Sequence, residues 1–319
     1  MGVTFFFDWE VSLMEWLQSN MGSFGVAVAS FCSLFGDSLF TVLIIGFLYW
    51  CWDKRKAVRV GIDVMMSVVI YPLVKNAVLR RRPYFDHPGI KCLKPVIADA
   101  DIYDITAQGF SFPSGHSSSV VASFGGTAYA FRKKWLTAVA VAGILLCGIS
   151  RFCVGVHYPT DVLCGWMIGI IIVLLMPVVE NAFKRRWLLY LVLFALMLPG
   201  WFYCDTDDYF TGVGMYIGFA CGDLFERRYV NFENTRRIPF LILRLVAGCG
   251  LFFALNTLLK LPFSGDFLDS GTFASHLVRL ARYAVGLFVL IGLYPLVFRH
   301  FEGLFPQKAK KTGPVQPAE

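Results

Sequence analysis

Long apolar segments recur along almost the whole chain, and they restrict its fold more than any other feature. With 319 residues, of which 57% are hydrophobic, and a mean hydropathy of +0.62, the chain is too apolar for an ordinary soluble domain. Backbone groups inside a bilayer must pair with each other, so apolar runs of about 20 residues are expected to cross it as helices. The sequence therefore predicts an all-α, polytopic membrane protein.

Nine crossings are expected, and short basic clusters between them set their orientation. The crossings are predicted near residues 23–50, 57–79, 115–131, 135–153, 161–183, 187–204, 209–225, 240–260 and 279–298. Clusters of Lys and Arg at 54–56, 132–134 and 184–186 fall at alternate helix ends, which the positive-inside rule assigns to the cytoplasm. The N-terminus is then outside and the C-terminus inside. The net charge of +7 does not indicate a nucleic-acid partner, because it is confined to such clusters.

Three polar blocks interrupt the pattern at helix ends that face away from the cytoplasm. They read K-N-A-V-L-R-R-R-P at 75–83, P-S-G-H at 113–116 and S-R-F-C-V-G-V-H-Y-P-T-D at 150–161. Ionisable groups beside apolar helices are costly and suggest function. Because topology alone disfavours cations on this side, we expect a bound anion, and our central prediction is that the three blocks converge on one phosphate site.

The first block places two cations near each other. Lys75 and Arg82 stand seven residues apart, which is about two turns along one face of a continuous helix. Arg82 would contact a phosphate in a bidentate manner and Lys75 as a point charge. The alternative is that both merely anchor a helix end. The extra Arg80 and Arg81 suit a diphosphate or face lipid headgroups.

The second block predicts the start of a helix. Pro113 and Gly115 favour a turn, and the apolar run that follows places the amides of Gly115 and His116 at a helix N-terminus. Free amides and the helix dipole favour an anion at this position, beside the hydroxyl of Ser114. The alternative is an ordinary N-cap by Ser114, with His116 as a polar residue at headgroup depth.

The third block carries Arg151, then His157, then Asp161 four residues later. A carboxylate bonded to one imidazole nitrogen leaves the other nitrogen free as a nucleophile. The alternative is an Asp that caps the next helix beside an interfacial His. Together the blocks supply cations for phosphoryl oxygens, a nucleophile and an acid for the leaving oxygen. No carboxylate cluster indicates a metal, and neither a metal nor another cofactor is expected.

In this order and spacing, the blocks resemble the type 2 phosphatidic acid phosphatase superfamily, which shares its site with vanadium-dependent haloperoxidases and bacterial acid phosphatases. The signature K-x6-R-P, P-S-G-H and S-R-x5-H-x3-D is matched at every position. The resemblance implies that His157 is the phosphorylated nucleophile, Asp161 its orienting partner, and His116 the general acid that later activates water. It also implies that the phosphate is held by Lys75, Arg82, Ser114, Gly115 and Arg151.

The resemblance covers about residues 57–170 and implies a five-helix phosphatase core. We therefore expect an interfacial amphipathic helix at 1–22, the core at 23–183, additional crossings at 184–300 and a basic cytoplasmic tail at 301–319. Nine crossings with this orientation also look like the glucose-6-phosphatase and sphingosine-1-phosphate phosphatase branches.

Three functions remain open. The first is metal-independent hydrolysis of a lipid phosphate monoester or diphosphate through a phosphohistidine, on a phospholipid, isoprenyl or sphingoid phosphate in the bilayer. The second is a phosphotransferase or hydrolase of soluble sugar phosphates, with Asp99, Asp101 and Asp104 shaping a polar pocket. The third is a transporter that binds phosphate without chemistry. A bacterial inner membrane or an endoplasmic reticulum membrane would both place the site on the non-cytoplasmic face, and the oligomeric state is left open.

Overall fold

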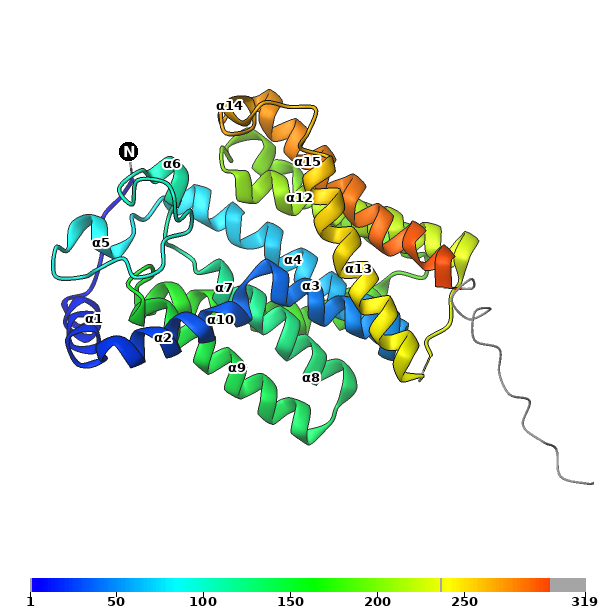
Figure 1. Ribbon diagram of the computed structural model, residues 1–319, viewed down its shortest axis with the longest axis horizontal. Helices are drawn as coiled ribbons and strands as arrows, with labels where there is room; N and C mark the ends of the chain where they lie inside the picture. The colour runs from blue at the N-terminus through cyan, green and yellow to red at the C-terminus, as the bar shows by residue number, and fades with distance from the viewer. Residues whose placement is uncertain (1, 236, 299–319) are drawn as a thin grey trace, which may run out of the picture.

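The computed structural model describes residues 2–235 and 237–298, so the predicted tail at 301–319 lies outside the described residues. This part of the chain is a bundle of helices, as the sequence predicts (Figure 1). The longer helices are α1 (Asp8–Asn20), α2 (Gly22–Ser33), α3 (Ser38–Phe47), α4 (Lys54–Val78), α9 (Lys134–Cys153), α10 (Pro159–Ala182), α11 (Arg186–Ala195), α12 (Asp207–Phe225), α13 (Ile238–Leu258) and α15 (Phe273–Phe288). The shorter ones are α5 (Pro83–Asp86), α6 (Ile105–Gln108), α7 (Gly115–Val120), α8 (Gly126–Phe131) and α14 (Gly265–Leu268).

Five of these helices are long and apolar enough to cross a membrane, counted over the described residues: α4, α9, α10, α13 and the helix that begins with α15. The pair α2 and α3, bent by 51°, would be a sixth. The protein is therefore an integral membrane protein, and the prediction of nine crossings is supported only in part. The segments predicted at 115–131, 187–204 and 209–225 are largely helical, but the first contains a π turn, the second is short and the third lies in α12, which carries three aspartates.

The crossing predicted at 23–50 is bent rather than straight. A 3₁₀ turn at Leu34–Gly36 ends α2, and Asp37 has an extended backbone before α3 begins. Gly36 permits a close approach at this bend, because an added Cβ would lie 2.7 Å from the Cβ of His116. The bend therefore brings the break between α2 and α3 against the start of α7.

Helix α12 lies between the core and the C-terminal helices. It packs against α4 on one side and runs beside α15 on the other (Figure 1). Gly214 allows the second contact, since a Cβ added there would lie 2.3 Å from the carbonyl oxygen of Leu280 in α15. The C-terminal helix α15 is thus attached through α12 to the helix that carries Lys75.

The α12–α15 contact gives a test of the fold. We expect Gly214→Ala to lower the free energy of unfolding by about 1–3 kcal/mol, because the two helices must move apart. Gly286→Ala in α15 is the matched control, because nothing lies within 4 Å of a Cβ added there. Thermal unfolding in detergent, followed by circular dichroism, measures both variants, and equal destabilisation by the two would contradict the close approach.

Candidate active site

The second block lies at the start of α7, as predicted. Ser114 is the N-cap residue, and its hydroxyl accepts the N–H of Ser117 at 3.3 Å. Gly115 and His116 are the first two helical residues, so their amides lie at the helix N-terminus. The N–H of Ser114 donates to the carbonyl oxygen of Asp161 at 3.0 Å. This hydrogen bond joins the second block to the third.

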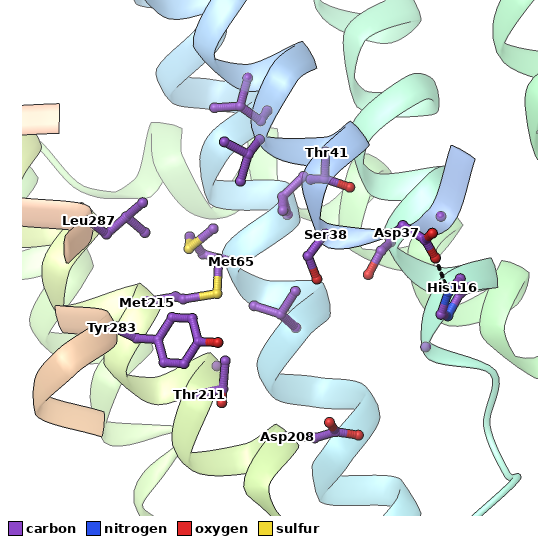
Figure 2. A pocket seen from close by; sticks show the side chains of 18 of the residues that line it. Asp37, Ser38, Thr41, Met65, His116, Asp208, Thr211, Met215, Tyr283 and Leu287 are labelled. Atoms are coloured by element: carbon purple, nitrogen blue, oxygen red, sulfur yellow. Dashed lines mark hydrogen bonds and ion pairs between the residues drawn. The ribbon is translucent and has the colours of Figure 1, made fainter. Parts of the chain in front are cut away.

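His116 has a carboxylate partner that sequence reasoning missed. Its Nε2 lies 2.7 Å from Oδ1 of Asp37, at the bend between α2 and α3 (Figure 2). Asp37 Oδ2 also lies 3.6 Å from Nζ of Lys94. The sequence did contain a signal for this contact. Asp37 is a single carboxylate within an apolar segment, where an ionisable side chain is costly and often functional. The contact orients the imidazole ring of His116.

Arg151, from the third block, lies in the last turn of α9 and is buried. Its Nη1 donates to the hydroxyl of Ser33. Its Nε is also buried and has no hydrogen-bond partner within the part of the chain that the structure describes. A buried guanidinium N–H without a partner is unusual and suits a bound anion.

His157 and Asp161 lie side by side where α9 leads into α10. Nδ1 of His157 lies 3.6 Å from Oδ2 of Asp161, which is longer than a hydrogen bond. The same carboxylate oxygen accepts the N–H of Tyr158 at 2.8 Å and so caps α10, which was the alternative interpretation of Asp161. Asp161 therefore combines the capping contact with a position beside the imidazole.

Positive charges from the first and third blocks lie near His157. The side chain is 2% exposed, and burial lowers the pKa of His157 well below its usual value. The charges of Arg82, Arg151 and Lys75 lower this pKa further, and His116 is a weaker contributor. The ring of His157 is consequently neutral at pH 7. Lys75, Arg82, His116 and Arg151, drawn from the three blocks, therefore lie within electrostatic reach of one imidazole.

The first block does not form the continuous helix that we predicted. Helix α4 ends at Val78, and Leu79 has a left-handed backbone with a φ of 56°. The prediction that Lys75 and Arg82 lie two turns apart on one helix face is therefore wrong. The chain turns at Leu79 because Arg80 and the residues after it pair with other segments, beginning with a backbone bridge to Val3.

Arg82 and Lys75 still lie near His157, but each has partners within the protein. Arg82 is buried and donates to three backbone carbonyls, those of Gln108, Gly109 and Val156. Lys75 forms an ion pair of 3.0 Å with Asp208, which lies in the first turn of α12 and whose side chain is 46% exposed. Sequence reasoning missed Asp208 because it is 133 residues from Lys75.

Arg80 does not face a diphosphate or lipid headgroups, which were the two roles considered for it. It is fully buried, with Nη1 donating to Asp161 at 2.5 Å and Nη2 donating to Glu10 at 3.0 Å. Glu10, from α1, also accepts the N–H of Thr160 at 2.9 Å. Arg80 is therefore a positioning residue that holds Asp161 beside His157. The half-buried Arg81 pairs with Asp86 nearer the surface.

A cavity of about 540 Å³ opens beside these residues. Asp99, Asp101 and Asp104, which were considered for shaping a polar pocket for a sugar phosphate, do not line this cavity. His157 is not among the lining residues either. Within residues 2–235 and 237–298, no group of three or more His, Cys, Asp and Glu residues is placed to hold a metal ion. The polar end of the cavity is lined by Asp37, Lys94, Gly115, His116, Arg151 and Asp208.

The fold and site define a class of integral membrane proteins in which two histidines, each beside a carboxylate, lie among buried cations at one end of a helical bundle. The chain belongs to the PAP2 superfamily. Residues 56–185 match the model of the PAP2 superfamily, and residues 210–308 match the model described as PAP2 superfamily phosphatase, transmembrane extension. The three sequence blocks fall within the first match.

Several relatives of known function are similar to this chain. Lipid A 1-phosphatase of Rhizobium etli is 35% identical over 107 residues, which are 33% of this chain and 42% of that protein. Phosphatidylglycerophosphatase B of Bacillus subtilis is 35% identical over 158 residues, 45% of this chain and 68% of that protein. An undecaprenyl-diphosphatase of Bacillus subtilis is 33% identical over 132 residues, 41% of this chain and 62% of that protein.

The extent of these matches limits what they show. The chain spans about half the length of the first relatives, from 42% to 51%. None of the relatives named above is a glucose-6-phosphatase or a sphingosine-1-phosphate phosphatase, so the expected likeness to those branches is not supported. No solved structure is a significant match to the chain.

The buried ion pairs of Arg80 predict a large loss of stability on substitution. We expect Arg80→Met to lower the free energy of unfolding by about 3–5 kcal/mol, because Glu10 and Asp161 would keep buried charges without their partner. Arg81→Met, at the neighbouring and more exposed position, should cost at most about 1 kcal/mol. Thermal unfolding of both variants in detergent makes the comparison, and similar transition temperatures would contradict this role for Arg80.

Proposed function

We propose that the protein is a membrane-integrated, metal-independent phosphatase that hydrolyses a lipid phosphate monoester or diphosphate through a phosphohistidine. The observation that carries this proposal is the position of His157, which is neutral, beside a carboxylate and within electrostatic reach of Lys75, Arg82 and Arg151. A neutral imidazole surrounded by cations is prepared both to attack phosphorus and to bind the oxygens around it. The names of the relatives support a phosphorylated lipid as substrate.

In the first step, Nε2 of His157 attacks the phosphorus atom, and the bond from phosphorus to the leaving oxygen breaks. His116 donates a proton to that oxygen, and its contact with Asp37 at 2.7 Å holds the ring in place for the transfer. Water attacks the phosphohistidine in the second step. His116 accepts a proton from the water, the P–N bond breaks, and phosphate leaves with His157 restored.

The phosphate oxygens would be held by Lys75, Arg82 and Arg151, with the Ser114 hydroxyl and the Gly115 amide. Lys75 is paired with Asp208, so the substrate must exchange with this carboxylate for the ammonium group. The buried Nε of Arg151 is a further donor, because no group in the described part of the chain accepts from it. These donors meet the negative charge that spreads over the oxygens in the transition state.

The cavity favours a lipid over a soluble sugar phosphate. Its polar end lies at His116 and Arg151, and its remaining wall includes apolar side chains such as those of Val42, Met65 and Phe219. A sugar would leave its hydroxyl groups without partners against such a wall, at a cost for each group. A hydrocarbon chain would be stabilised by the same contacts.

The location of the site follows from the membrane topology that we propose. Nine crossings, with the N-terminus outside and the C-terminus inside, place the three blocks on the non-cytoplasmic face of a cell inner membrane, or of the endoplasmic reticulum in a eukaryote. We also propose the division into a phosphatase core at 23–183 and additional transmembrane helices at 184–300. The limits of the two family matches, 56–185 and 210–308, support this division.

Replacing the proposed nucleophile tests the function. We expect His157→Ala to lower phosphate release from phosphatidate, or from an isoprenyl diphosphate, by at least about 10³-fold, because no other group can form the covalent intermediate. His87→Ala is the control, because His87 packs against Phe6 and Tyr158 and does not line the cavity. A variant without His157 that stays folded and active, or a strict requirement for magnesium in the wild type, would contradict the mechanism.

The pH dependence provides a second test. Because its pKa is lowered, His157 stays neutral at pH values below its usual pKa of about 6.5, so the acidic limb of kcat/KM should lie below that pH. Lys75→Met removes one of the charges that lower this pKa, so the limb should move to higher pH. Ionisation of the substrate is the same for both enzymes and cancels in the comparison. Superimposable profiles would show that Lys75 does not act on His157.

A further inference from the structure

The bend between α2 and α3 contacts two site residues that come from different sequence blocks. Oδ1 of Asp37 lies 2.7 Å from Nε2 of His116, and the hydroxyl of Ser33 accepts a hydrogen bond from Nη1 of Arg151. Figure 2 shows the side chains of Asp37 and His116 directed toward each other, from the beginning of α3 and the beginning of α7. The bend therefore holds an imidazole and a guanidinium group of the site at the same time.

Lys94, from the loop between α5 and α6, joins the same bend. Its Nζ donates to the hydroxyl of Ser33 at 3.2 Å and to the carbonyl oxygen of Ser30 at 3.4 Å. The same nitrogen lies 3.6 Å from Oδ2 of Asp37. The two carboxylate oxygens of Asp37 thus face different partners, Lys94 and His116, and this fixes the orientation of the carboxylate.

The bend lies outside the part of the chain that carries the family signature. Neither Ser33 nor Asp37 belongs to one of the three sequence blocks, and both precede residue 56, where the match to the PAP2 superfamily model begins. The bend is nevertheless fitted closely to the site. A Cβ added at Gly36 would lie 2.7 Å from Cβ of His116 and 2.9 Å from Sγ of Cys147 in α9. Contacts to site residues therefore come from a segment that the signature does not include.

The contact with Asp37 determines which nitrogen of His116 can react. Because Nε2 is held by the carboxylate, Nδ1 remains for proton transfer. A carboxylate bonded to one imidazole nitrogen fixes the tautomer and stabilises the positive charge of the ring while the other nitrogen carries a proton. The side chain of His116 is 30% exposed and lines the cavity, so its ring reaches the space beside the phosphate site. At 2.7 Å this contact is also shorter than the 3.6 Å between His157 and Asp161.

We propose that Asp37 is a positioning residue for both proton transfers of His116, and that hydrolysis of esters with strongly basic leaving groups depends on it. The proposal rests on the proposed phosphatase function and deepens it. In the first step, Nδ1 of His116 passes a proton to the leaving oxygen as the P–O bond breaks, and the proton on Nε2 stays hydrogen-bonded to Asp37. In the second step, Nδ1 takes a proton from the water whose oxygen bonds to phosphorus, and the P–N bond to His157 breaks.

The first experiment varies the leaving group. Its substrates are an alkyl phosphate and a nitrophenyl phosphate that carries the same alkyl chain. Asp37→Asn should lower kcat/KM for the alkyl phosphate by about 10²-fold, because its alkoxide needs a proton to leave. For the nitrophenyl phosphate kcat/KM should remain near that of the wild type, because nitrophenolate leaves without a proton and kcat/KM reports only the steps up to its release. Equal losses on both substrates, or no loss on the alkyl phosphate, would overturn the proposal.

The matched control for this experiment is Asp99→Asn. It makes the same substitution at an exposed position of the loop that does not line the cavity. Both substrates should be hydrolysed by this variant as by the wild type. A selective loss on the alkyl phosphate in Asp99→Asn as well would show that the effect is not specific to the contact with His116, and it would count against the proposal.

The second experiment observes the second proton transfer. With the nitrophenyl phosphate, Asp37→Asn should release nitrophenolate rapidly in an amount equal to that of the enzyme, and then turn over about 10²-fold more slowly than the wild type, because water attack lacks an effective base. An unchanged steady-state rate would overturn the proposal. If His157→Ala kept full turnover, the phosphohistidine and the proposed function would fail, whereas a selective effect of Asp37→Asn on the alkyl phosphate would still stand.

The third experiment asks whether Asp37 acts through His116. On phosphatidate, the variant with both Asp37→Asn and His116→Ala should be no slower than His116→Ala alone, because a positioning residue has no effect once the group that it positions is removed. Losses that multiply in the double variant would show that the two residues act independently, and they would overturn the proposal. Circular dichroism of all three variants in detergent checks that they remain folded.

Discussion

The buried ion pairs of Arg80 are the interactions on which the arrangement of the site depends. Arg80 follows α4 and connects Glu10 of α1 with Asp161 of α10, and all three side chains are buried. Each charge alone would be strongly destabilising in this position, so the three segments are stable only when they meet. Because Asp161 lies beside His157, the same contact that joins the segments also fixes the carboxylate next to the imidazole.

The requirement that buried charges meet a partner also explains why the site forms where helices break. The bend between α2 and α3 exposes Asp37 to His116, and the left-handed Leu79 turns the chain so that Arg80 and Arg82 enter the bundle. The breaks shorten the crossings but bring charged groups from separate helices within reach of each other, which is what binding an anion requires.

How much of the fold and of the site could be predicted depends on how far apart in the sequence the interacting residues lie. The all-α class follows from apolar runs, which act within a few turns, and the proximity of the three sequence blocks was predicted from the membrane face that the basic clusters assign to them. Other features depend on partners far away in the chain: the ion pair of Lys75 with Asp208, the contact of Glu10 with Arg80, and the bend at Asp37. No local pattern specifies such pairs. The seven-residue spacing of Lys75 and Arg82 was misleading, because our interpretation assumed one continuous helix through both residues. Helix α4 in fact ends at Val78.

The transmembrane extension acts on the site in two ways that share one helix. Through Asp208, α12 neutralises Lys75, and through Met215 and Phe219 the same face of α12 lines the cavity. A movement of α12 away from α4 would therefore free the ammonium group of Lys75 and widen the cavity in a single step. Because α15 packs along α12, it would resist that movement. The pairing of Lys75 and the width of the cavity are thus coupled by the position of a helix that carries none of the three sequence blocks.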